Sequence, residues 1–178
     1  MEIDQVINSK LIGEFYLRKD KSRNFIGIRY LADENILRNE DGRVYLFCSD
    51  RVIKKIGGSQ SKGGIKSTMS FYINSMQGSP GKPRFILHLL LRDDLIQGKH
   101  CTIHMIISPR VDSKINGLYS KIRIPIAAFK EMEDLCKKDY FSVMKKYPVW
   151  NFQENNEDYP SNYSKEHLIY HDKRLKNK

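Results

Sequence analysis

The sequence predicts an α+β fold, and three observations support this. Strand-like stretches rich in β-branched and aromatic residues come early in the chain, helical patterns alternate with further strands after them, and no segment repeats. The 178 residues, 40% of them hydrophobic, suffice for one domain with a sizeable core. We therefore expect a single domain over residues 1–178, with a small mixed β-sheet flanked by helices.

The first half of the chain contains the strand signals. Residues 1–40 are expected to open with a helix or irregular segment, followed by the extended stretch "NFIGIRYLA". The turn signal "NEDG" then precedes two short strands, "RVYLFC" and "RVIKKI". A loop rich in glycine and serine, residues 57–64, leads into a helix that begins at Ile65, where apolar residues recur at helical spacing.

The second half mixes helices and strands. Pro83 and Gly98 bound a largely buried helix. Residues 101–107 form a buried strand, 108–117 a loop, and 119–126 a further strand. Residues 127–146 form the longest helical pattern, and a short helix is expected at 164–175, inside a polar and aromatic tail.

The charge balance indicates a polyanionic partner. Lysine and arginine number 31 against 21 acidic residues, a net charge of +10. Basic side chains that reach phosphates release counterions, so this excess favours nucleic acid binding. The N-terminal residues do not resemble a signal peptide, and no apolar run is long enough for a membrane span. The three widely spaced cysteines indicate reduced thiols, so we expect a cytoplasmic protein with no membrane contact.

The hairpin formed by the two short strands carries a candidate site. If residues 49–51 form a three-residue turn, Tyr45 lies directly opposite Lys55 on one face of the sheet. An ammonium group beside a phenol lowers its pKa and makes it a potential general base. The alternative is that Tyr45 packs in the core while Lys55 extends to water.

Glycines and a second lysine follow the hairpin. Gly57 and Gly58 allow a phosphate to approach the backbone closely. Lys66 lies near the start of the next helix, one position round from its apolar stripe. It is either a phosphate contact or a solvated helix lysine.

These residues resemble the GIY-YIG nuclease superfamily, most closely its small type II restriction endonucleases. Val44-Tyr45-Leu46 is similar to the first namesake tripeptide, and Lys55-Ile56-Gly57 is similar to the second, with lysine in place of tyrosine. The resemblance implies that Tyr45, Lys55 and Lys66 are catalytic. Lys66 stands where the superfamily usually has arginine, and a lysine lacks the guanidinium fork. The resemblance covers residues 42–150 as the catalytic core.

The superfamily also has a metal-binding glutamate on a later helix. With Phe129 placed at 0° and about 100° per residue, Glu133 falls at about 40°, at the edge of the inward apolar stripe. A carboxylate there is costly unless it is paired or bound to metal. We therefore assign the metal-binding role to Glu133. The alternative is a half-exposed glutamate paired with Lys137 at i+4.

The resemblance implies a site-specific endonuclease that hydrolyses double-stranded DNA with Mg²⁺ or Mn²⁺ and leaves 5′-phosphate ends. It also implies a homodimer and a companion DNA methyltransferase. The flanks, residues 1–41 and 151–178, are expected to serve DNA binding or dimerisation. Two alternatives stay open: another GIY-YIG nuclease, of the homing, repair or phage type, and a non-catalytic nucleic-acid-binding module on the same fold.

Overall fold

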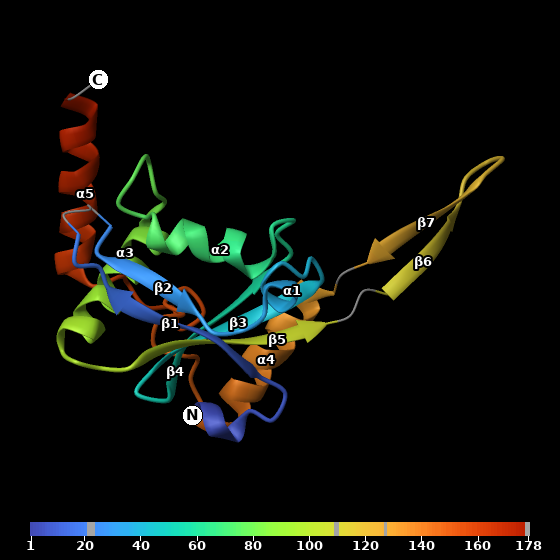
Figure 1. The fold of residues 1–178 in the computed structure, drawn as a ribbon, viewed down its shortest axis with the longest axis horizontal. Helices are drawn as coiled ribbons and strands as arrows, with labels where there is room; N and C mark the ends of the chain where they lie inside the picture. Colours follow the sequence, from blue (N-terminus) through green and yellow to red (C-terminus); the bar gives the residue numbers. More distant parts are fainter. Residues whose placement is uncertain (21–23, 109–110, 127, 177–178) are drawn as a thin grey trace.

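A five-stranded antiparallel sheet forms the centre of the molecule (Figure 1). The computed structural model describes residues 1–20, 24–108, 111–126 and 128–176. The strand order is β2-β1-β5-β3-β4, so β2 and β4 are the two edges. Its strands are β1 (Lys10–Leu17), β2 (Ile26–Tyr30), β3 (Gly42–Ser49), β4 (Val52–Ser59) and β5 (Cys101–Ser108).

Helices cover both faces of this sheet, and each face has its own apolar cluster. The larger cluster joins Phe15 and Phe47 of the sheet to Met69 and Phe85 of the helices α2 and α3. On the opposite face, Leu46 and its neighbours pack against Tyr140 of α4. The helices are α1 (Glu34–Leu37), α2 (Gly64–Ile73), α3 (Lys82–Ile96), α4 (Phe129–Met144) and α5 (Ser161–Lys176), and a single 3₁₀ turn, η1, spans Ile3–Gln5.

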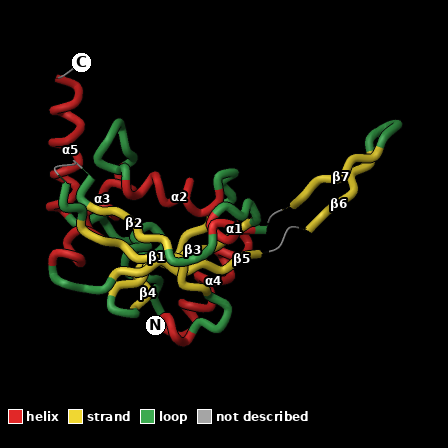
Figure 2. Tube along the Cα trace, in the orientation of Figure 1, coloured by secondary structure: helices red, strands yellow, loops and turns green. Residues whose placement is uncertain are grey.

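Two further strands, β6 (Val111–Asn116) and β7 (Lys121–Ile126), pair only with each other among the described strands. They form a separate antiparallel ribbon that projects away from the sheet (Figure 2). At the opposite end of the molecule, α5 packs on α3. None of the helices in the described ranges is long and apolar enough to cross a membrane.

The α+β class is confirmed, with corrections to the elements. The sheet is antiparallel throughout and not mixed. Residues 10–17, expected to be helical or irregular, form β1 next to β5, and residues 111–116, expected to be a loop, form β6. The helices expected from residues 65, 83 and 127 are present as α2, α3 and α4, although residue 127 lies outside the described ranges.

Candidate active site

The hairpin of β3 and β4 has a different register from the expected one. Its turn has two residues, Asp50 and Arg51, both with positive φ, so Ser49 pairs with Val52. A bulge follows at Lys54, and beyond it Tyr45 pairs with Gly57. The prediction that Tyr45 lies directly opposite Lys55 is therefore wrong.

Tyr45 and Lys55 nevertheless project to the same face of the sheet. The bulge moves the pairing by one residue, which compensates for the shorter turn and restores the expected side-chain alternation. Lys55 now lies opposite Phe47, one diagonal step from Tyr45. The two side chains are thus diagonal neighbours at the β4 edge.

Tyr45 is buried on the face covered by α2. Its hydroxyl lies 2.6 Å from the hydroxyl of Tyr72 in a hydrogen bond that either group can donate. Both hydroxyl-bearing rings reach a small pocket of about 180 Å³ between the end of β4, α2 and the start of α3. The residues that line it are Tyr45, Gly58, Ser59, Ser61, Thr68, Phe71, Tyr72 and Arg84.

The pKa of Tyr45 shifts opposite to the expectation. Burial raises the pKa of the Tyr45 phenol well above its ordinary value, and the neighbouring Tyr72 and the Glu133 carboxylate add to the rise. Arg84 opposes it. Lys55 therefore does not make Tyr45 acidic in the folded chain, and Tyr45 is a neutral phenol near pH 7.

Gly57 and Gly58 form a notch in the edge strand β4. A methyl group on Gly57 would overlap the Tyr45 hydroxyl, and one on Gly58 would overlap a carboxylate oxygen of Glu133. Because consecutive strand residues point to opposite faces, the phenol and the carboxylate reach β4 from its two sides. At these two positions the edge strand presents only its backbone to the phenol and the carboxylate.

Glu133 lies on the inward side of α4, as the helical spacing predicts. It is half-buried and paired with Lys137, whose Nζ lies 2.7 Å from Glu133 Oε1, so the i+4 pair is also present. The same Nζ lies 2.5 Å from Glu154 Oε1. Burial lowers the pKa of the Lys137 ammonium, but the two ion pairs outweigh burial and the pKa is raised. Two carboxylates thus share one cation beside the glycine notch.

Asn151 fixes this network to the open edge of β4. Its side-chain Oδ1 accepts from the backbone N–H of Ile56 at 2.9 Å, and its Nδ2 donates to the Ile56 carbonyl at 3.1 Å. The same Nδ2 lies 3.0 Å from Glu154 Oε1. Burial lowers the pKa of the neighbouring Lys55 ammonium, and the Glu154 carboxylate opposes that shift. Sequence reasoning missed Asn151 and Glu154, which lie beyond the segment that carries the motif.

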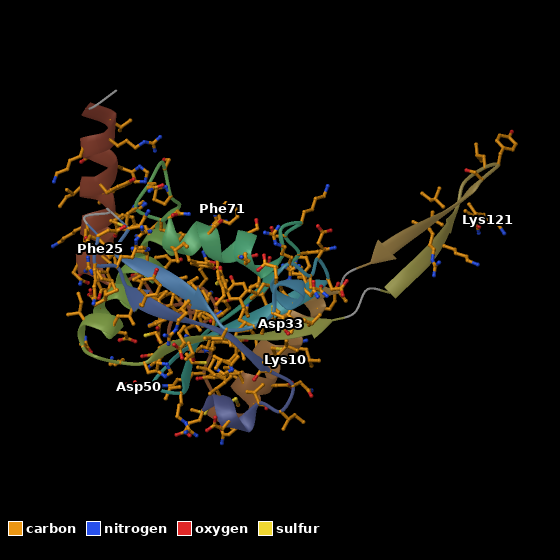
Figure 3. All side chains as sticks on the ribbon, in the orientation of Figure 1. Lys10, Phe25, Asp33, Asp50, Phe71 and Lys121 are labelled. Carbon is orange, nitrogen blue, oxygen red and sulfur yellow. The ribbon has the colours of Figure 1, made fainter. Side chains whose placement is uncertain are left out.

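Lys66 does not reach the pocket. Its Nζ lies 3.1 Å from Glu34 Oε2 of α1 and 5.3 Å from the centre of the Tyr30 ring. Arg84 lines the pocket instead, with its guanidinium 4.4 Å from the ring of Phe71 on the outer side of α2 (Figure 3). The Lys66 ammonium is thus paired with Glu34, and Lys66 is not among the residues that line this pocket. The sequence feature that could have drawn attention to Arg84 is Pro83, because it marks the start of the helix that carries Arg84.

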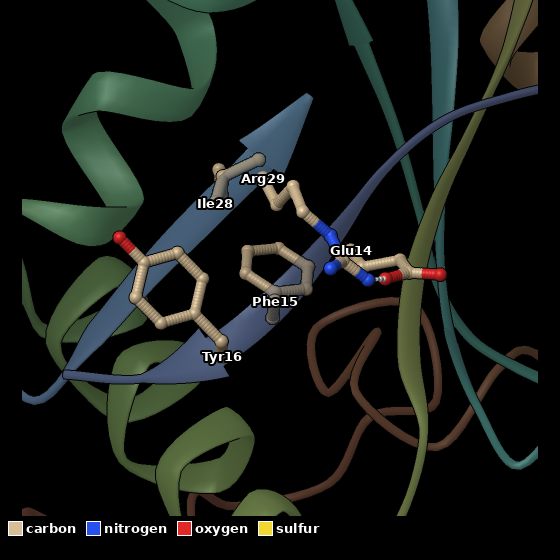
Figure 4. A pocket seen from close by; sticks show the side chains of 5 residues that line it. All are labelled: Glu14, Phe15, Tyr16, Ile28 and Arg29. Atoms are coloured by element: carbon tan, nitrogen blue, oxygen red, sulfur yellow. Dashed lines mark hydrogen bonds and ion pairs between the residues drawn. The ribbon is translucent and has the colours of Figure 1, made fainter. Parts of the chain in front are cut away.

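A second pocket lies near the opposite edge of the sheet from β4 (Figure 4). It lies on β1 and β2, where Glu14 forms an ion pair with Arg29 and contacts His100 at 3.2 Å. The Arg29 hydrogen bond holds the pKa of Glu14 below its ordinary value. Its only carboxylate is neutralised by two basic partners, whereas the notch in β4 combines a phenol pair, two carboxylates and several cations.

Comparison with known proteins gives a likeness of fold. No protein-family model matches the chain, and no curated protein matches it. A solved structure of restriction endonuclease HPY188I in complex with product DNA is 18% identical, with a TM-score of 0.51 over 84% of each chain. A mutant of bacteriophage T4 EndoII is 13% identical, with a TM-score of 0.49 over 79% of this chain and 91% of that one.

These comparisons correct the expected GIY-YIG membership. No model of any family matches, and the solved structure that is similar in fold is described as a restriction endonuclease. The three-residue turn expected for the hairpin is also wrong, since Tyr45 faces Gly57. The likeness that stands is one of fold, to restriction endonuclease HPY188I.

Proposed function

We propose that this chain is a DNA endonuclease that hydrolyses phosphodiester bonds at the notch in β4. One observation carries the proposal: Tyr45 and Glu133 reach Gly57 and Gly58 from opposite faces of one edge strand. Because β4 carries no side chain at these two positions, the phenol and the carboxylate both reach its backbone. The net charge of +10 and the likeness in fold to a restriction endonuclease solved with product DNA support this class of substrate.

Each residue of the proposed site has a separate role in the reaction. The hydroxyls of Tyr45 and Tyr72 share one hydrogen bond, so the pair retains a proton and lone pairs with which to hold the attacking water. Arg84 faces the same pocket and offsets charge on the phosphate through its planar fork of donors. Lys55, beside Tyr45 on the same face, adds a second positive charge. The net reaction adds water across the P–O3′ bond and leaves a 5′-phosphate and a 3′-hydroxyl.

The carboxylates fit a hard divalent cation. Glu133 and Glu154 already share the Lys137 ammonium, which marks the space between them as favourable for positive charge. Mg²⁺ binds through one or two carboxylates and keeps several waters, so three protein ligands are not required. Glu133, with Glu154 beside it, would hold Mg²⁺ or Mn²⁺, and the ion would neutralise charge developing on the leaving oxygen.

In its finer form, the proposal is a type II restriction enzyme that acts on double-stranded DNA as a homodimer, with a companion DNA methyltransferase. Residues 42–150 then form the catalytic core. The flanks, residues 1–41 and 151–178, serve DNA binding or dimerisation, and Asn151 and Glu154 join the second flank to the site.

The test is incubation of plasmid DNA with the purified chain and Mg²⁺. Discrete fragments are expected for the wild type, and EDTA should abolish them. Tyr45→Phe and Glu133→Gln should each reduce cleavage by about 100-fold or more while DNA binding persists. The matched controls, Tyr16→Phe and Glu131→Gln, alter exposed side chains and should cleave normally. Intact plasmid with bound wild-type protein would mean a binding module, and normal cleavage by either site variant would overturn the site.

A further inference from the structure

The β6–β7 ribbon is a separate projection of the molecule. Its two strands pair over six residues each, and Figures 1 and 2 show it extending away from the sheet and the helices. At about 3.3 Å per residue, it reaches about 20 Å beyond its base. Among the described strands β6 and β7 pair only with each other, and an isolated two-stranded hairpin is only marginally stable in water, so a partner surface is expected.

The register gives the ribbon two chemically distinct faces. Lys114 pairs with Arg123, and Asn116 pairs with Lys121. Between these pairs, Ile115 is opposite Ile122. Directly opposed residues share a face and successive pairs alternate, so one face is basic and the other is apolar.

The basic face concentrates like charges. Lys114 and Arg123 are exposed and directly opposed across the strands. Lys121 extends the same face toward the tip (Figure 3). Exposed basic side chains gathered on one face of a projection favour a polyanion such as a row of phosphates.

The tip is apolar and fully exposed. Leu118 is 94% exposed and Tyr119 is 101% exposed at the turn that joins the strands. Large apolar side chains at the end of a basic projection are what groove-binding proteins insert against base edges or between base steps. A two-stranded ribbon also fits the width of the DNA major groove.

We propose that the β6–β7 ribbon is a DNA-binding arm. Lys114, Lys121 and Arg123 contact phosphates that lie beyond the cleavage site, and Leu118 and Tyr119 enter the adjoining groove. The inference rests on the proposed function, because it takes the substrate of the β4 notch to be duplex DNA. The basic face selects DNA over a second copy of this chain, whose surface is itself strongly basic.

The test compares salt dependence of binding. The arm variant carries Lys114→Glu, Lys121→Glu and Arg123→Glu, and the matched control carries Lys10→Glu, Lys138→Glu and Lys146→Glu. All six residues are exposed, and the two variants have the same net charge. Anisotropy of a fluorescein-labelled duplex in EDTA, over a salt series, gives the slope of log K against log salt.

We expect the arm variant to bind at least tenfold more weakly at low salt, with a slope smaller by about 2 to 3, because each phosphate that the arm no longer reaches removes about one unit. The control should keep a slope close to that of the wild type. Leu118→Ser with Tyr119→Ser should weaken binding and leave the slope unchanged, because it removes no charge. Unaltered thermal unfolding of each variant shows that the body remains folded.

Plasmid cleavage separates the two proposals. If the wild type binds and cleaves DNA but the arm variant keeps the wild-type affinity and slope, the arm inference is wrong and the proposed function stands. If the wild type neither binds nor cleaves, the proposed function is wrong. If the arm variant keeps its slope and changes only its sedimentation coefficient, the ribbon contacts a second copy of the chain, which also overturns the arm inference.

Discussion

At the scale of single residues, space is the reason for two successive glycines in β4. Neither Gly57 nor Gly58 has a positive φ, so backbone freedom does not require glycine at these positions. Each hydrogen-only side chain instead leaves room for a reactive oxygen, the Tyr45 hydroxyl on one face and the Glu133 carboxylate on the other. The proposed site therefore depends on the absence of a side chain at Gly57 and Gly58.

Protonation of the buried His88 opposes folding. It is fully buried on α3, where its Nδ1 lies 2.8 Å from the Tyr72 carbonyl and its Nε2 accepts from the backbone N–H of Phe25. Only the neutral ring satisfies both bonds. Burial lowers the pKa of His88 to about 4, and the charge of Arg92 contributes.

This shift predicts a pH dependence of stability. The unfolded chain takes up a proton on His88 near pH 6.5 and the folded chain only near pH 4, so the free energy of unfolding falls as pH drops through this window. The expected loss from His88 is about 3 kcal/mol and is complete below about pH 4. Urea unfolding from pH 7 to pH 4 measures it.

His88→Gln provides the comparison, because glutamine stays neutral over this range. The variant should be less stable at pH 7 and should show a shallower decline toward pH 4, since the other titrating groups are common to both chains. Parallel curves for the variant and the wild type would contradict the assignment of the pH dependence to His88.

At the scale of elements, the hairpin shows what the sequence could and could not predict. The presence of the two hairpin strands followed from local patterns, but Tyr45 and Lys55 share a face only because an unpredicted bulge offsets the shorter turn. The register did not follow from local patterns, because Asp50-Arg51 is not a usual sequence for a turn with two positive φ values. His100, next to β5, holds that turn through bonds to the Asp50 backbone and carboxylate.

The direction of the Lys66 side chain also depends on contacts between elements. Its offset from the hairpin placed it on the correct helix, but its direction depends on Glu34 of α1, which forms an ion pair with it. Arg84 fills the corresponding space from α3, a different element. The positions of the Lys66 and Arg84 side chains are both set by contacts between elements, which local sequence patterns do not reveal.

The edge of β4 depends on one side chain outside the sheet. Asn151 provides the partners for the N–H and the carbonyl of Ile56, both buried. Asn151→Ala leaves both groups unsatisfied and should lower the free energy of unfolding by about 2 to 4 kcal/mol. Urea unfolding at neutral pH measures this loss.

The matched control for Asn151 is Gln153→Ala, an exposed position two residues away, which should change stability by less than about 0.5 kcal/mol. Asn151→Ala should also reduce plasmid cleavage in molecules that remain folded, because Glu154 loses a donor that positions it beside Lys137. Equal stabilities of the two variants would show that the edge of β4 does not need this clamp.

At the scale of the whole molecule, the α+β class could be predicted, but two strands could not. The segment of β1 was not recognised as a strand, although it lies inside the sheet between β2 and β5. The segment of β6 is polar and follows Pro109, and its strand character depends on pairing with β7. Residues 119–126 were recognised as a strand, so what the sequence did not reveal in the ribbon was the pairing partner of β7.

Cleavage of both strands of a DNA duplex requires two proposed active sites. In the described chain, Tyr45 and Glu133 form one proposed site at Gly57 and Gly58. Hydrolysis of both DNA strands needs two such sites, which a homodimer would supply. Wild-type chains co-refolded with a large excess of Tyr45→Phe chains should form dimers with one working site. These dimers should accumulate nicked circular plasmid, which an agarose gel separates from linear DNA. Co-refolding with Tyr16→Phe chains should give linear DNA as before. Linear product without a nicked intermediate at every ratio would mean that one chain cuts both strands, and the homodimer would be wrong.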